Sequence, residues 1–88
     1  PQGEFDRKKW LLNKEERYEM SHDVIERKIL IGKTKNRVRE LLGDEGNKDE
    51  EDVWVYYLGF VPGIHIDPDI LEIEFKAGKV VKVVQRET

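Results

Sequence analysis

Residues 70–85 read ILEIEFKAGKVVKVVQ, and this stretch decides the fold of the chain. From Ile70 to Phe75 apolar and acidic residues alternate, which is the pattern of a strand with one buried side and one side in water. A second run, Val80 to Gln85, is rich in valine and follows a short segment that contains a glycine. Two such runs separated by a few turn residues predict an antiparallel hairpin.

The length of the hairpin loop follows from which residues would face each other. A two-residue loop at Ala77-Gly78 would mix polar and apolar residues on both faces, because a slip of one residue exchanges the faces of a strand. A three-residue loop from Lys76 to Gly78 keeps the faces separate and places Gly78 at the left-handed position of a G1-bulge turn. The pattern therefore favours the longer loop. It pairs Ile73 with Val81, Leu71 with Val83 and Glu72 with Lys82.

A third strand and a helical segment precede this hairpin. The β-branched and aromatic run Val53 to Phe60 is typical of a strand, so residues 53–86 predict a three-stranded meander. Residues 14–43 predict a helical hairpin, with an apolar stripe at helical spacing from Lys14 to Ile29. Thr34 is a good N-cap for the second helix, since its hydroxyl accepts a free main-chain N–H. Gly43 suits the left-handed position after that helix.

The order of these elements predicts an α+β fold with two N-terminal helices packed on one face of a three-stranded antiparallel sheet (ααβββ). Eighty-eight residues are enough for one domain, residues 1–88. We expect residues 44–52 to form a solvated acidic loop between the two halves. Residues 1–13 are ambiguous, but they contain too many apolar side chains for a free tail, so we expect some of them to dock on the domain.

The composition excludes several classes of site. There is no cysteine, so neither a disulfide nor a thiolate metal site is possible within these residues. The formal net charge is −3, and the basic residues of the first half are interleaved with acidic ones. Nucleic-acid binding needs a concentrated basic stripe, so we expect no nucleic-acid partner. No residue is assigned to a catalytic, cofactor or metal site.

Three short motifs suggest chemistry, and each has a plainer explanation. Ser21-His22-Asp23 has the residue types of a hydrolase triad, but neighbours on a helix diverge by about 100° and do not converge on one atom. Gly32-Lys33-Thr34 ends like a phosphate-binding loop, yet Arg27 stands where the first glycine belongs. The acidic loop does not fit the spacing of an EF-hand.

Carboxylates and histidines complete this survey. Glu72 and Glu74 lie about 7 Å apart by strand rise and more plausibly form cross-strand pairs with Lys82 than an acid–base pair. His22 and His65 lack a second ligand at metal spacing. We therefore expect no enzymatic activity, no metal and no cofactor.

Three motifs, in this order, resemble the SmpA/OmlA (BamE-type) domain of outer-membrane-assembly lipoproteins. They are GKTKNRVRELLG at 32–43, WVY at 54–56 and LEIEFKAGKV at 71–80. Trp10, Arg17 and Met20 resemble residues of small uncharacterised lipoproteins with the same fold. The resemblance implies two helices on a three-stranded sheet, related to the β-lactamase-inhibitor-like fold. The matching residues are glycines, a cap and core aromatics, so the resemblance transfers no binding residue.

The resemblance also implies a role. We expect a non-enzymatic protein-interaction or scaffold module of the cell envelope, monomeric and held to a membrane only through an upstream lipidated cysteine. The alternative is an inhibitor of a secreted enzyme. The partner itself stays unidentified.

The outer face of the sheet, away from the helices, is the candidate partner surface in the sequence. Glu72, Glu74 and Lys82 lie on it with apolar residues of the first strand and with Val80 and Val84. Exposed apolar patches often mark interaction sites, and a partner strand joining an edge of the sheet is a second possibility. The alternative is that residues 1–12, with Phe5, Trp10, Leu11 and Leu12, fold back and cover this face.

Overall fold

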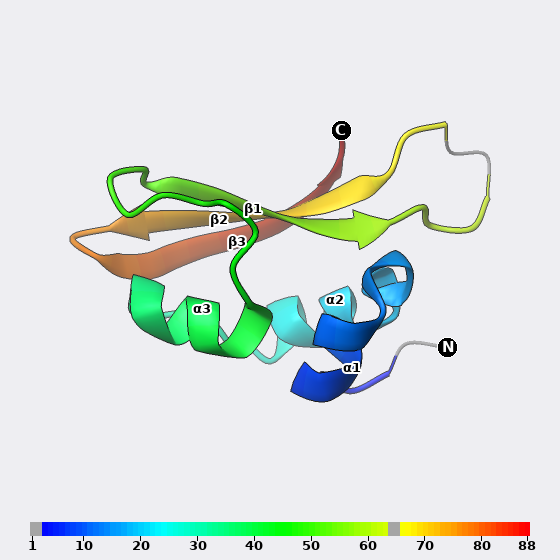
Figure 1. The fold of residues 1–88 in the computed structure, drawn as a ribbon, viewed down its shortest axis with the longest axis horizontal. Coiled ribbons are helices and arrows are strands. Elements are labelled where there is room, and N and C mark those ends of the chain that lie inside the picture. The colour runs from blue at the N-terminus through cyan, green and yellow to red at the C-terminus, as the bar shows by residue number, and fades with distance from the viewer. Residues whose placement is uncertain (1–2, 64–65) are drawn as a thin grey trace.

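The computed structural model describes residues 3–63 and 66–88. Helices α1 (Arg7–Leu12), α2 (Tyr18–Glu26) and α3 (Lys35–Leu42) come first, with a 3-10 turn η1 (Lys14–Glu16) between α1 and α2. Strands β1 (Val53–Gly59), β2 (Asp69–Lys76) and β3 (Lys79–Glu87) follow and form one antiparallel sheet in the order β1-β2-β3. All three helices lie on one face of this sheet (Figure 1). The predicted α+β architecture is therefore confirmed.

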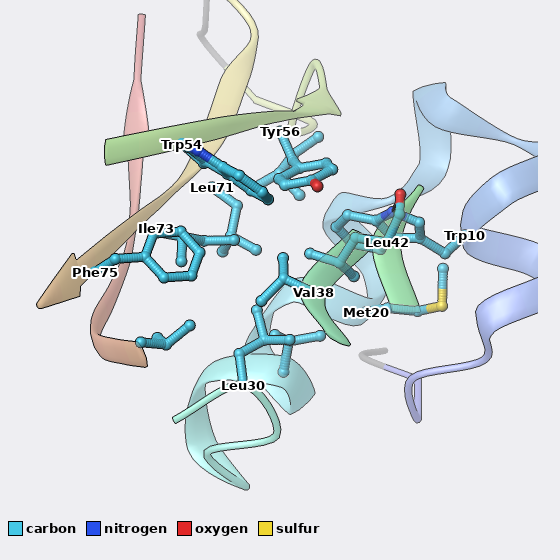
Figure 2. Packing of buried hydrophobic residues seen from close by; sticks show 13 residues of the cluster. Trp10, Met20, Leu30, Val38, Leu42, Trp54, Tyr56, Leu71, Ile73 and Phe75 are labelled. Carbon is cyan, nitrogen blue, oxygen red and sulfur yellow. Dashed lines mark hydrogen bonds between the residues drawn. The ribbon is translucent and has the colours of Figure 1, made fainter. Parts of the chain in front are cut away.

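The core lies between the sheet and the helices. Inward-facing side chains of the strands meet those of the helices and of the segment that joins α2 to α3 (Figure 2). Because an 88-residue chain has little apolar material, the large aromatic rings supply much of it. The cluster is Trp10, Met20, Val24, Leu30, Val38, Leu42, Trp54, Tyr56, Leu58, Leu71, Ile73, Phe75 and Val80.

The ambiguous N-terminal segment is part of this core. Asp6 caps α1 by accepting the N–H of Lys9 at 3.2 Å, and α1 turns Trp10 inward until it is fully buried. The Trp10 indole Nε1 donates to the carbonyl of Leu42 at 3.0 Å. Residues 3–12 thus lie on the helical side, so the expected docking on the domain is confirmed and the alternative in which they cover the outer face is wrong.

The predicted helix from Lys14 to Ile29 is shorter and is broken at its start. Its first turn is the 3-10 turn η1, and α2 ends at Glu26. Ile29 N–H bonds the carbonyl of Val24 and Lys28 N–H that of Ile25, which is the Schellman pattern of a helix end. Lys28 occupies the left-handed position with φ 51°, where a glycine is usual. No glycine marks this end in the sequence, so the pattern of apolar residues alone suggested a longer helix.

The start and end of α3 agree with the sequence. The Thr34 hydroxyl accepts the N–H of Arg37 at 3.2 Å, and Gly43 has φ 87° after the last residue of the helix. No helix among the described residues has the length and apolar character needed to cross a bilayer.

The hairpin loop is shorter than predicted. Lys76 pairs with Lys79, which leaves a two-residue turn with positive φ at both Ala77 (53°) and Gly78 (79°), as a type I′ turn requires. The register shifts at the next step, since Phe75 pairs with Val80 but Glu74 pairs with Lys82. Val81 is the extra residue of a β-bulge, and it restores the separation of faces that the short turn alone would destroy.

The outer face carries the expected carboxylates but not every expected valine. Val53 and Val55 of β1 pair with Glu74 and Glu72, and both valines are exposed. Val80 instead pairs with Phe75 and is only 2% exposed, so its predicted place on the outer face is wrong. The bulge is the reason, because it changes which valines of β3 point inward.

Candidate functional site

The acidic loop 44–52 runs alongside the free edge of β1. The Asn47 side chain donates to the carbonyl of Val55 and accepts its N–H, both at 3.1 Å, as a neighbouring strand would. The Glu45 carboxylate accepts the N–H of Tyr57 at 3.2 Å, and Arg17 donates to the carbonyl of Tyr57 at 3.1 Å. Seven of the nine loop residues are exposed, as expected, while the side chains of Asn47 and Glu45 bond the edge of β1.

A buried arginine fixes this loop to the helical layer. Arg17 is 1% exposed, forms an ion pair with Glu45 and donates to the carbonyl of Trp10 at 2.9 Å. Its guanidinium carbon lies 4.6 Å from the centroid of the Trp10 ring, a favourable cation–π distance. Trp10 and Arg17, which the sequence analysis grouped together, thus share one contact, and Met20 is buried in the same core.

The phenol of Tyr56 lies beside the same network. It is fully buried and donates to the carbonyl of Gly43 at 2.8 Å. Burial first, and then the negative charge of Glu45, raise the pKa of Tyr56 to about 12. This phenol therefore stays protonated and keeps its hydrogen bond at any physiological pH.

The edge of β3 is hydrogen-bonded to the segment before α3 at its beginning. Gly32 N–H donates to the carbonyl of Val80, and Val80 N–H donates to the carbonyl of Lys33, both at 2.9 Å. In an antiparallel ladder, main-chain groups turn alternately toward the neighbouring strand and away from it. The main-chain N–H and C=O groups of Val55 and Tyr57 in β1 point away from β2. Following the pairing through β2 to β3, the main-chain groups of Val83 and Gln85 point toward the free edge of β3.

These edge groups of Val83 and Gln85 have no hydrogen-bond partner among the described residues. The two edges of the sheet therefore differ. Loop 44–52 and Arg17 satisfy the edge groups of Val55 and Tyr57 on β1, whereas those of Val83 and Gln85 on β3 have no such partner in the described part of the chain. We call the segment 81–85 of β3 the open edge.

A pocket of about 330 Å³, lined by five apolar side chains and one lysine, lies between α2 and this open edge. Its walls come from the last turn of α2, the segment after it and the bulge of β3. Val81 and Ile31 are 48% and 40% exposed, so the apolar lining is accessible from outside. The lining residues are Val24, Ile25, Lys28, Ile31, Val81 and Val83.

Two local irregularities shape the pocket. The left-handed conformation of Lys28 turns the chain away from the end of α2. The β-bulge places Val81 at the mouth of the pocket. A left-handed conformation costs a non-glycine residue roughly 1–2 kcal/mol. Lys28 bears this cost at the end of α2, where it also lines the pocket.

Three lysines lie around the open edge. Lys28 lies at the pocket, Lys79 begins β3, and Lys82 lies on the outer face opposite Glu74. None of these three lysines is in an ion pair with another described residue. The site thus combines unpaired main-chain groups, the pocket and free ammonium groups.

The Ser21-His22-Asp23 side chains have separate partners. The Ser21 hydroxyl donates to Gln85 Oε1 at 2.6 Å and is buried under β3, whereas His22 is exposed. Asp23 accepts two hydrogen bonds from Arg27 and one from the N–H of Phe5. The hydrogen bond from Arg27 first, and then that from Phe5, lower the pKa of Asp23. These contacts hold α2 to its neighbours.

The carboxylates of β2 are paired across the sheet. Arg86 donates to Glu72 at 2.6 Å, and Glu74 lies opposite Lys82. The predicted partner of Glu72 was Lys82, and the bulge changes this pairing. Within residues 3–63 and 66–88, no three metal-ligating side chains gather into a group. His65 lies outside the described residues.

The sequence analysis did not identify the pocket. One signal was present, since the valine pairs at 80–81 and 83–84 interrupt the alternation of β3. Two adjacent apolar residues would normally point to opposite faces of a strand, and a bulge is one way to accommodate such a pair. Lys28 and Ile31 gave no such signal, because only the three-dimensional path of the chain brings them to β3.

Comparison with known proteins does not add a relative: no family model, curated protein or solved structure matches the chain.

Proposed function

We propose that this protein is a non-catalytic binding module that holds an extended segment of another protein against the open edge of β3. Strand addition of this kind uses main-chain hydrogen bonds for affinity and side-chain pockets for specificity. The observation that supports the proposal most is the coincidence of the two at one place. Val83 and Gln85 offer the hydrogen bonds, and the pocket beside Val83 offers the specificity.

The geometry determines which side chains of the added strand would reach the pocket. A residue placed beside Val83 would share its face of the sheet, because side chains alternate along a strand and neighbours across it share a face. That face is the one toward α2, where the pocket opens. The volume of about 330 Å³ is at the lower end of the range for binding pockets, which suits one or two apolar side chains at alternate positions.

We also propose that the module works in the cell envelope. The support is the order of the motifs that resemble the SmpA/OmlA domain, residues 32–43, 54–56 and 71–80. A signal peptide with a lipid-attachment cysteine in the reading frame upstream of these residues is the expected finding. A reading frame without one would contradict this location and would leave the proposed binding site standing.

A library of random eight-residue peptides displayed on phage tests the binding function. The decisive variant is Val81→Glu, which places a charge at the mouth of the pocket, and its control is Val53→Glu on β1. The two valines are 48% and 46% exposed, so neither change buries a charge. Val53→Glu also places its carboxylate opposite Glu74, so it lowers stability without touching the pocket. We expect enriched peptides to bind the wild type and Val53→Glu and to lose at least tenfold in affinity for Val81→Glu. Equal binding to all three proteins, or no enrichment, would contradict the proposal.

A further inference from the structure

We infer that the segment bound at the open edge of β3 is an acidic strand, with apolar side chains toward the pocket and carboxylates toward the outer face. This inference rests on the proposed function and specifies the chemistry of its ligand. The pattern of β3 and of its existing neighbour β2 supports it.

The existing neighbour of β3 already shows the complementary pattern. On β2, Ile73 pairs with Val83 on the helical face, and Glu74 pairs with Lys82 on the outer face. Lys82 projects from the outer face of β3, and β3 has β2 on one side and its open edge on the other. An added strand would therefore neighbour Val83 and Lys82 from the side opposite β2. Opposite charges that are neighbours across two strands stabilise the pairing, and like charges destabilise it.

The lysines around the site extend this preference. Lys28 at the pocket rim and Lys79 at the start of β3 have no ion pair with another described residue. An acidic segment would bring carboxylates near these ammonium groups, and their attraction would also raise the rate of encounter at low salt.

A second copy of this chain is a poorer occupant. If two open edges paired antiparallel with Val83 of one copy opposite Gln85 of the other, Lys82 would lie opposite Arg86 of the second copy, and lysine on an edge strand is a known obstacle to such self-pairing. The charge that opposes self-association favours an acidic partner. The inference therefore commits to a peptide segment of another protein.

Three synthetic peptides, acetylated and amidated, test this inference with the full chain. Their sequences are ETELEVE, QTQLQVQ and KTKLKVK, which keep the apolar residues at alternate positions and change only the charge of the others. Binding is measured by NMR titration at about 50 mM salt, with the amides of Val83 and Gln85 as the reporters. We expect ETELEVE to bind at least tenfold more tightly than KTKLKVK, with QTQLQVQ between them. The difference should shrink as salt is added, because exposed charges are screened.

Lys28→Gly is the matched variant for the charge of the protein. It removes the ammonium group and places the preferred residue at a left-handed position, so the fold is retained. We expect the affinity for ETELEVE to fall about two- to fivefold, the range for one exposed ion pair, and that for QTQLQVQ to stay within experimental error. Lys8→Gln, a change on the exposed side of α1, serves as the control and should alter neither.

The outcomes separate the inference from the proposed function. If all three peptides shift Val83 and Gln85 with equal affinity, the acidic preference is wrong and the binding edge stands. If ETELEVE leaves these amides unchanged at millimolar concentration, the acidic preference is also wrong, and the phage library decides on the edge. If the chain dimerises through the same amides without peptide, the occupant is a second copy and the inference is overturned.

Discussion

The two edges of the sheet have the same backbone chemistry and opposite surroundings. On β1, Asn47, Glu45 and Arg17 satisfy the main-chain groups of Val55 and Tyr57. On β3, Gly32 and Lys33 satisfy those of Val80, and the open edge begins directly after it. Proteins usually protect edge strands, because exposed main-chain groups are templates for pairing with other chains. The comparison therefore indicates that this chain protects one edge with a dedicated loop and leaves the other available.

The protected edge ends in a close contact with η1. Gly59 has φ 95°, and a side chain at this position would collide with the main chain of Glu15. Asn47, Glu45 and the η1 turn thus cover the edge of β1 from Val55 to Gly59, with Arg17 joining the last two. Removing these contacts one at a time tests how the protection works.

The largest effect is expected for Arg17→Met. This change keeps the bulk of the side chain but removes the buried partner of the Glu45 carboxylate, which then has only the exposed Lys14, 3.9 Å away, as a cation partner among the described residues. Breaking a buried pair from one side costs about 3–5 kcal/mol. Urea unfolding followed by circular dichroism measures the loss. Glu45→Gln, which keeps a hydrogen-bond acceptor, should cost less, and a loss below about 1 kcal/mol for Arg17→Met would show that the pair does not hold the loop.

Alkaline titration gives the next largest effect. An unfolded tyrosine loses its proton near pH 10, whereas burial keeps that of Tyr56 until about pH 12. The folded state therefore holds one more proton in this window, so its stability is complete below pH 10 and falls by about 2–3 kcal/mol by pH 12.

The matched variants for this titration are Tyr56→Phe and Tyr57→Phe. The hydrogen bond to Glu15 raises the pKa of Tyr57 in the same direction, but that phenol is on the exposed outer face. Urea melts at several pH values should show a flatter decline for Tyr56→Phe than for Tyr57→Phe. The reverse order would contradict the burial of Tyr56 beside the loop.

Asn47→Ala opens the protected edge directly. It removes two hydrogen bonds to Val55 and leaves the main-chain groups of that residue to water, which should cost about 1–2 kcal/mol. Asn36→Ala, an exposed position on α3, is the control and should change stability by less than about 0.5 kcal/mol. Equal effects of the two substitutions in thermal melts would mean that Asn47 does not act as a substitute strand.

Lys28→Gly should have the smallest effect and the opposite sign. Glycine adopts the left-handed conformation of this position without the steric cost that lysine bears, so stability should rise by up to about 1 kcal/mol. Gly32→Ala, at φ 82° in the same segment, is the reverse experiment and should lower stability. A destabilised Lys28→Gly protein would show that the lysine stem supports the pocket.

The sequence predicted the layers of this fold better than its edges. The structure confirms three local signals: the alternation of residues 70–75, the Thr34 cap and the glycine after α3. The hairpin register was not predictable from pairing alone, because the bulge at Val81 gives the same separation of faces with a shorter turn.

The candidate site could not be predicted from the sequence, because it also depends on contacts between distant residues. The loop 44–52 looks like an ordinary solvated acidic run, and only the position of β1 reveals what Asn47 and Glu45 bond. The pocket joins residues of α2 and β3 that are more than fifty positions apart, and its turn depends on a lysine where a glycine would be expected. Composition and periodicity carry no information about such long-range contacts.

Amide hydrogen exchange followed by NMR tests the difference between the two edges most directly. In the free monomer we expect the amides of Val55 and Tyr57 to be protected and those of Val83 and Gln85 to exchange rapidly, although all four lie in strands. The amide of Val84, which bonds β2, is the internal reference and should be protected. Protection of Val83 and Gln85 equal to that of Val84 in a monomeric sample would contradict the open edge and the binding site built on it.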